Sequence, residues 1–223
     1  SKGGWVCVSG YKNNYLELEF EKFKNFNDIL SKNFKLVLVD IPIGLDDELT
    51  KGGRLVDKLA RSELLTNKSS VFNAPSRLTL DAKNYEEANV INKNQGMGLS
   101  KQSWYLIKKI KEVDEFIKKT DSINIFESHP EIVFQTMKKN KVGTKKKNSD
   151  GILERKELLE KNGFRKSFIE KFLFARDSFY KKDDFIDSCS LFWSANRVAQ
   201  KKELRIPDKI FRDSQGIIMQ IRV

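Results

Sequence analysis

Four acidic side chains, far apart in the sequence, are the strongest candidates for chemistry in this chain. Asp40 and Glu127 each follow a run of apolar residues, a pattern typical of a buried strand. Asp184 and Asp187 are three residues apart, which puts both on one face of a helix. Carboxylates that gather at neighbouring strand ends repel one another unless a cation holds them. The four acids therefore predict a cation site, and the alternative for the helical pair is ordinary capping of a first turn.

The chemistry that needs several carboxylates is phosphodiester hydrolysis assisted by divalent ions. Mg²⁺ and Mn²⁺ prefer oxygen ligands, which carboxylates from several elements can share. In such sites one ion activates the attacking water and a second, about 3.5–4 Å away, steadies the leaving oxygen. We therefore expect Mg²⁺ or Mn²⁺ as the cofactor.

Histidine and cysteine offer no competing metal chemistry. His129 is the single histidine, and the two cysteines, Cys7 and Cys189, lack the spacing of a zinc site or a disulfide framework. We expect His129 to orient Glu127 or the following turn through a hydrogen bond, in preference to direct proton transfer.

The elements that must position these residues alternate between strands and helices, which predicts an α/β fold. We expect an antiparallel hairpin of strands 4–9 and 15–20, strands at 34–39 and 123–126, and a small strand at 217–221 within a C-terminal tail. Helices are expected at 25–32, 53–65, 85–92, 101–119, 152–161, 165–180 and 183–201. The organisation is a single domain, 1–223, with a helical insertion at about 46–120 and a mobile Lys-rich loop at about 138–150.

Composition points to a polyanionic partner. The chain has 223 residues and a formal net charge of +11, which favours capture of nucleic acid. A Lys-rich surface also arises from a general composition bias, so the charge supports that partner without establishing it. No apolar stretch reaches the roughly 20 residues of a membrane helix, and the first residues lack the layout of a signal peptide. We expect a cytoplasmic protein with no membrane contact, and the sequence does not predict its oligomeric state.

Eight short motifs resemble one family. In chain order they are Ser1–Val6, Asp40–Leu45, Arg54 with Asp57 and Arg61, Ser70–Phe72 with Ala74–Arg77, Gly98–Gln102, Glu112–Asp114, Glu127–Glu131, and Asp183–Asp184 with Asp187. The pattern resembles the domain-of-unknown-function family 429 (DUF429), predicted ribonuclease H-like nucleases, from Ser1 to about Pro207.

The resemblance implies a ribonuclease H-like mixed sheet flanked by helices, with a large helical insertion. Asp40 and Glu127 would lie on neighbouring strand ends, and the helix with Asp184 and Asp187 would close the site, as in RuvC-type resolvases. Family members open with a strand that ends in Asp-Gly before the Gly-Gly-Trp segment, and that aspartate is not present ahead of Gly3. Either the residues given lack that strand, which we favour, or the protein has lost one metal ligand.

Five further polar residues in the motifs are candidate substrate-binding residues, and His129 is a sixth. Arg54, Arg61, Arg77, Lys101 and Gln102 are expected on inserted helices and loops near the mouth of the site, where they could contact phosphates. The structural alternative pairs Arg77 with Glu131 and Arg61 with Asp57.

Three functions remain open. The first is a metal-dependent nuclease in which Asp40, Glu127 and Asp187 bind the metal, while Glu127 and Asp184 complete the catalytic set or position the water. The second is a nucleic-acid-binding protein that keeps the fold without turnover. The third is a phosphotransferase of the acetate and sugar kinase type, which would need two glycine-rich phosphate loops that the sequence does not supply.

Overall fold

The mixed α/β architecture expected from the sequence is confirmed in a computed structural model. The structure describes residues 3–120, 122–143, 148–176 and 179–223. Its strands are β1 (Trp5–Ser9), β2 (Glu19–Phe23), β3 (Leu36–Val39), β4 (Asn124–Glu127), β5 (Arg205–Arg212) and β6 (Ile218–Arg222). Its α-helices are α1 (Leu55–Glu63), α2 (Tyr85–Asn94), α3 (Lys101–Lys119), α4 (Pro130–Lys138), α5 (Ser149–Lys161), α6 (Lys166–Leu173) and α7 (Lys182–Ala199), and short 3₁₀ helices are η1 (Phe26–Lys32), η2 (Lys68–Ser70) and η3 (Arg77–Thr79).

Four strands form a mixed sheet in the order β3-β4-β6-β5. β3, β4 and β6 run parallel, and β5 pairs antiparallel with β6. β1 and β2 form a separate antiparallel hairpin in which Trp5 pairs with Phe23 and Ser9 with Glu19. Helix α7 packs against both β1 and β3, so it joins the hairpin to the larger sheet.

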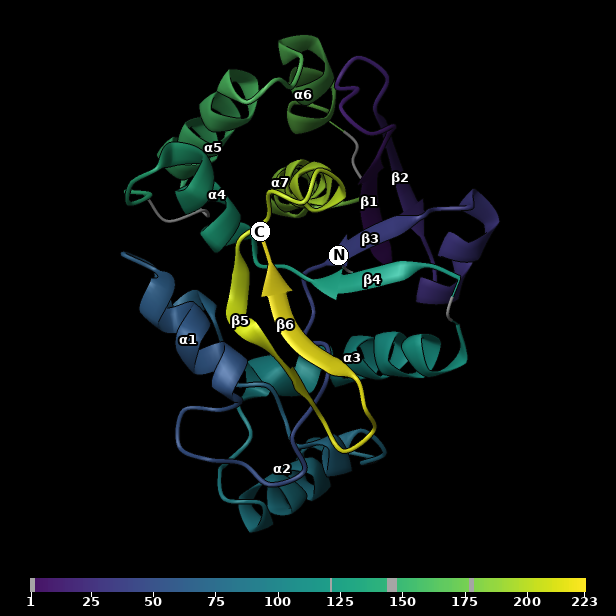
Figure 1. Cartoon of the computed structure of the whole chain (residues 1–223), viewed down its shortest axis with the longest axis vertical. Coiled ribbons are helices and arrows are strands. Elements are labelled where there is room, and N and C mark those ends of the chain that lie inside the picture. The colour runs from purple at the N-terminus through teal and green to yellow at the C-terminus, as the bar shows by residue number, and fades with distance from the viewer. Residues whose placement is uncertain (1–2, 121, 144–147, 177–178) are drawn as a thin grey trace.

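Helices cover the strands on both sides (Figure 1). On one side lie α7 and, around it, α4, α5 and α6; their buried residues form a cluster that we call the α7-side core, with Val8, Phe185 and Ile221 among its members. On the other side α3 and η1 enclose the α3-side core, which includes Val39 and Val113.

Alternation along each strand divides its side chains between these two cores. In β1, Val8 belongs to the α7-side core, whereas Trp5 and Cys7 pack against the α3-side core. In β3, Val37 and Val39 pack with the α3-side core. The residues that alternate with them, Leu38 and Asp40, therefore point to the opposite face of the sheet.

The inserted elements α1, α2 and α3 lie between β3 and β4 in the chain. Helix α3 has the bounds expected from its periodicity, and it begins where the Ser100 hydroxyl accepts a hydrogen bond from the Ser103 N–H at 3.0 Å. Helix α2 begins in the same way, with the Asn84 side chain accepting from Glu87 N–H at 2.9 Å. Each start follows from a capping residue that the sequence displays.

The hairpin and the C-terminal region differ from the predictions. The second hairpin strand lies at Glu19–Phe23 and not at 15–20, because the ring of Tyr15 packs edge-on against Phe164 and Phe192. The region from 206 onward is not a tail with one small strand. It forms the β5-β6 hairpin, and β6 lies inside the sheet.

The helices also differ from the predictions in three places. α4 was not predicted, although Pro130 at its first position is a typical start. The helix expected at 165–180 ends at Leu173 in α6, and residues 177–178 lie outside the described residues. Of the Lys-rich segment 138–150, residues 144–147 also lie outside them, while Lys138 ends α4 and Ser149 begins α5. Among the helices that the structure describes, none combines the length and apolar character needed to cross a membrane.

Candidate functional site

The carboxyl ends of two parallel strands carry the first pair of predicted acids. Val39 in β3 pairs in register with Glu127 in β4, and the Ser128 N–H donates to the Val39 carbonyl at 3.0 Å. Asp40, one residue further on, is therefore level with Ser128. Residues that are level on parallel strands point to the same face, and successive residues alternate. Glu127 thus shares the face of Val39, whereas Asp40 and Ser128 share the opposite face.

Glu127 is held by a buried arginine. The Arg54 Nη2 lies 2.9 Å from Glu127 Oε1, and Nη1 lies 3.1 Å from Oε2. The Ile43 N–H also donates to Oε2, at 2.8 Å. Burial raises the pKa of Glu127 above its usual value, while Arg54 acts in the opposite direction. Both oxygens of this carboxylate are therefore occupied by protein donors.

Arg54 itself is fully buried and fully used. Its guanidinium donates to Asp57 Oδ1 at 2.6 Å and to the carbonyl oxygens of Ile43 and Gly44 at 2.9 and 2.7 Å. Burial acts to lower the pKa of Arg54, but Asp57 and Glu127 outweigh burial and raise it. The arginine thus ties the turn after β3 to the start of α1 and the end of β4.

The second pair of acids lies in the first two turns of α7. Asp187 is buried and Asp184 is half-buried, so this face of the helix is turned toward the protein. α7 packs against β3, and the carboxyl ends of β3, β4 and β6 converge beside it (Figure 1). Asp40 is exposed at the end of β3, the strand against which α7 packs.

Two polar residues follow Glu127 directly. The hydroxyl of Ser128 is buried, and within the described part of the chain it has no hydrogen-bond partner. His129 precedes the first turn of α4, and its Nε2 lies 3.4 Å from the carbonyl oxygen of Ser70. His129 thus connects the end of β4 to the last residue of η2.

The residues expected to contact phosphates are divided between three environments. Arg54 is buried as described, and Arg77 donates to Asp114 at 2.8 Å and to Asp213. Arg61 and Gln102 line a pocket, and Lys101 is exposed at the start of α3. Lys101 and Gln102 are exposed and Arg61 is half-buried, and Arg61 and Gln102 line the same pocket.

The ion pairs considered as structural alternatives have other partners. Glu131 pairs with buried Arg155, whose Nη2 lies 2.8 Å from both carboxylate oxygens, and not with Arg77. Arg61 donates to the carbonyl oxygens of Val71, at 3.0 Å, and Gly52, while Asp57 pairs with Arg54.

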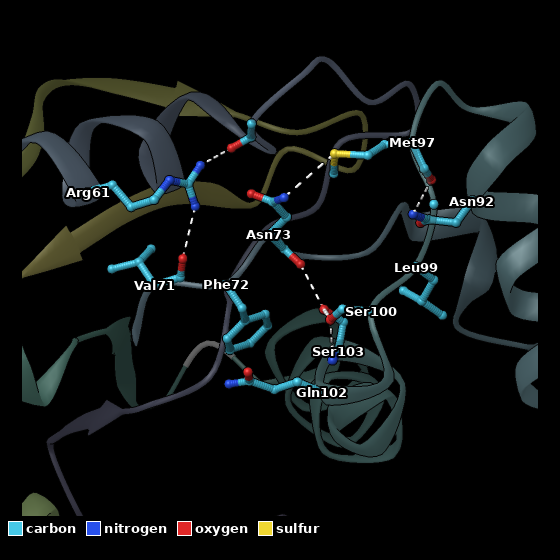
Figure 2. A pocket seen from close by; sticks show the side chains of 12 residues that line it. Arg61, Val71, Phe72, Asn73, Asn92, Met97, Leu99, Ser100, Gln102 and Ser103 are labelled. Carbon is cyan, nitrogen blue, oxygen red and sulfur yellow. Dashed lines mark hydrogen bonds between the residues drawn. The ribbon is translucent and has the colours of Figure 1, made fainter. Parts of the chain in front are cut away.

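A pocket of about 390 Å³ lies between α1, the loop after η2 and the start of α3. Figure 2 shows the ring of Phe72 beside the amide of Gln102, with Asn73 and Met97 above them. Leu99 completes the apolar part of the lining. The motif segments Ser70–Arg77 and Gly98–Gln102 therefore meet at this pocket.

A divalent metal fits only part of the predicted ligand set. Asp40 and Asp187 offer the oxygen donors that Mg²⁺ prefers, and the buried Ser128 hydroxyl lies on the face of Asp40. Glu127 does not fit, because Arg54 and Ile43 occupy its oxygens. Within residues 3–120, 122–143, 148–176 and 179–223, no three His, Cys, Asp or Glu side chains gather as a group able to hold a metal ion.

Neither cysteine is suited to nucleophilic chemistry. Burial, with a smaller effect of Glu21, raises the pKa of the Cys7 thiol to about 12. Burial and the charge of Asp187 raise the pKa of the Cys189 thiol as well. Both thiols are therefore protonated at neutral pH, whereas the reactive form of a cysteine is the thiolate.

Sequence reasoning missed three contributors to this region. Asp213 accepts from Leu45 N–H at 3.0 Å and pairs with Arg77, so it links the C-terminal hairpin to the turn after β3. Arg155 neutralises Glu131, and Phe72 forms a pocket wall. Nothing in the sequence around Asp213 or Arg155 indicates their distant partners. Phe72, by contrast, lies in the motif Ser70–Phe72, which could have indicated its role.

Comparisons with known proteins identify one similarity. A family model described as Protein of unknown function (DUF429) matches residues 1–211. No curated protein and no solved structure matches the chain significantly.

Proposed function

Because the chain belongs to the DUF429 family, we propose that it is a divalent-metal-dependent nuclease built on a ribonuclease H-like sheet. One observation carries the proposal. Asp40 follows β3 at the carboxyl end of the sheet, α7 packs against β3, and the first turns of α7 carry Asp184 and Asp187. Ligands of open α/β sheets bind at this end of the strands.

The proposed site uses two of the four acids as metal ligands and a third to position the water. Asp40 and Asp187 hold Mg²⁺ or Mn²⁺, and Asp184 orients the attacking water. When bound, the metal neutralises charge on the phosphate and lowers the pKa of that water. Glu127 is assigned a positioning role: with Arg54 it holds the turn that begins at Asp40.

The charge of the whole chain supports a nucleic acid as the partner. A net charge of +11 attracts polyanions and accelerates their association. Lys101 is exposed at the start of α3, where it can contact a phosphate. We propose that the protein acts in the cytoplasm, which is supported by its two free thiols, Cys7 and Cys189.

A specific observation favours a second candidate, nucleic-acid binding without hydrolysis. Arg54 neutralises Glu127, and the described residues bring no three metal-ligating side chains together. Two carboxylates with an auxiliary aspartate form a weaker metal site than three ligating carboxylates. Turnover is therefore the property that separates the two candidates.

Cleavage assays with matched variants test the proposal. Single-stranded, duplex, hybrid and branched DNA and RNA are incubated with the protein and Mg²⁺ or Mn²⁺. We expect cleavage that requires the metal and that falls by at least about 100-fold in Asp40→Asn and in Asp187→Asn, because each removes a ligand. Asp183→Asn, a change of the same charge one residue before Asp184, is the control and should keep most of the activity.

Glu127→Gln separates a positioning role from a ligand role. If Glu127 is a positioning residue, Glu127→Gln should lower the free energy of unfolding and change the affinity for Mn²⁺ little. Calorimetry on the folded variant measures that affinity. Binding of nucleic acid with no cleavage under any metal condition supports the second candidate. Cleavage that Asp40→Asn and Asp187→Asn leave unchanged contradicts this site.

A further inference from the structure

The pocket lined by Phe72 and Gln102 combines an aromatic wall with neutral polar groups. Its volume is about 390 Å³, within the range of roughly 300–1,000 Å³ typical of small-molecule sites. Phe72, Met97 and Leu99 supply apolar surface, and Asn73 and Gln102 supply amides that both donate and accept hydrogen bonds. Phe72 is half-buried and Gln102 is exposed, so both can be reached from solvent.

The charges around the pocket select the class of ligand. None of the lining residues is an Asp or a Glu, so the pocket does not favour a cation. Arg61 is the one charged residue of the lining, and both its terminal nitrogens donate to backbone carbonyls, of Val71 and Gly52. These donors are therefore committed to the protein, and amides and an aromatic ring remain for the ligand.

The pocket is linked to the end of β4 through Ser70 and His129. The carbonyl of Ser70 contacts His129, which is two residues after Glu127. Phe72 is two residues after Ser70, and two residues of chain span at most about 7 Å. The wall of the pocket is thus close to the carboxyl end of β4, beside which Asp40 lies.

We propose that this pocket binds one unstacked base of a single-stranded nucleic acid. That the ligand belongs to a nucleic acid rests on the proposed function. That its base enters the pocket rests on the aromatic ring and the amides of the lining. Every base has a π-face that stacks on an aromatic ring, and its edge offers the donors and acceptors that amides pair with. Enzymes that act on single strands or extruded nucleotides hold the base in this way, between apolar side chains and polar groups at its edge.

Equilibrium binding in EDTA tests the pocket independently of cleavage. The probes are a short single-stranded DNA oligonucleotide, its RNA equivalent, and an abasic DNA strand of the same length and charge. We expect the wild-type protein to bind the base-containing strands roughly 5- to 150-fold more tightly than the abasic strand, the range expected for stacking of one base. The abasic strand measures the contribution of charge alone.

Variants of the lining should remove that preference and leave the affinity for the abasic strand unchanged. Phe72→Leu keeps an apolar side chain but loses the π-face, and Gln102→Ala removes an exposed amide without disturbing packing. Tyr105→Ala is the control, since Tyr105 is an exposed aromatic residue on α3 outside the lining. Far-UV circular dichroism confirms that each variant is folded.

The outcomes distinguish this inference from the proposed nuclease function. A base preference that Phe72→Leu and Gln102→Ala abolish supports the pocket even if no cleavage is found. Equal affinity of the wild-type protein for base-containing and abasic strands overturns the inference even if cleavage is found. A preference that Tyr105→Ala removes and Phe72→Leu keeps overturns it as well, because the base then binds elsewhere.

Discussion

At the end of β4, a carboxylate that the sequence offers as a metal ligand is the counter-ion of an arginine. Glu127 and Asp57 share the guanidinium of Arg54, and all three side chains are buried. Burying an ionised group is costly unless its partners are close and its hydrogen bonds are made. Here every nitrogen of the Arg54 guanidinium donates, to the two carboxylates and to the carbonyl oxygens of Ile43 and Gly44. Removing any one of the three side chains therefore leaves a buried charge without its partner.

Arg54→Met tests this network at the scale of one residue. The variant leaves Asp57 and Glu127 buried without their cation, and removing one partner of a buried pair costs about 3–5 kcal/mol. Urea unfolding followed by circular dichroism should show that loss in the free energy of unfolding. Lys58→Met, in the helix that Arg54 precedes, is the control and should stay close to the wild type, because the Lys58 ammonium donates to the Thr50 hydroxyl near the surface and to no buried acid among the described residues. A loss below about 1 kcal/mol in Arg54→Met would show that the pair is not a buried unit.

At the scale of elements, the turn after β3 decides where Asp40 lies. Gly44 in this turn has φ +73°, a conformation that side chains with a Cβ rarely adopt. A Cβ at Gly44 would meet the side chain of Met219 in β6 and approach the carbonyl of Ile217 to 3.3 Å. The turn therefore packs directly on the C-terminal hairpin, and a larger residue has no space there.

Gly44→Ala measures that packing when it is compared with Gly216→Ala. Gly216 has φ +78°, and a Cβ there would meet no atom within 4 Å. Both variants suffer the same backbone strain, but only Gly44→Ala is also overpacked. We expect Gly44→Ala to lose about 1–3 kcal/mol more of the free energy of unfolding than Gly216→Ala. Equal losses in urea titrations would mean that the turn moves away from β6 at little cost.

At the scale of the whole molecule, the last residues complete the sheet. β6 lies between β4 and β5, and the backbones of Leu204 and Val223 exchange two hydrogen bonds, at 2.6 and 2.9 Å. Ile221 belongs to the α7-side core, whereas Ile217 belongs to the α3-side core. The hairpin therefore contributes to both cores at once.

Deletion of residues 203–223 should abolish cooperative folding. The deletion exposes the edge of β4 and removes apolar side chains from both cores, so we expect a chain without a sigmoidal thermal transition that binds the dye ANS. Lys209→Ala, at an exposed position of β5, is the control and should keep the transition. A truncated chain that still unfolds cooperatively would show that the rest of the molecule folds without β6.

The sequence by itself determined the local elements and the residues that end them. The apolar runs before Asp40 and Glu127 are strands, and the periodicity of residues 101–119 is helix α3. These features depend on alternation, helical spacing and capping groups a few residues apart, which a sequence displays directly. The type of these elements and the order of the candidate acids could therefore be predicted, whereas α4 and β5 could not.

Only the tertiary structure decided what surrounds those acids. Alternation puts Glu127 and Asp40 on opposite faces of the sheet, and Arg54, 73 positions before Glu127, takes that carboxylate. The ring of Tyr15 moves the hairpin strand because it packs on Phe164, which no local pattern indicates. Partners of charged and aromatic side chains come from distant segments, since burial and pairing depend on how whole elements pack and not on neighbours in the chain.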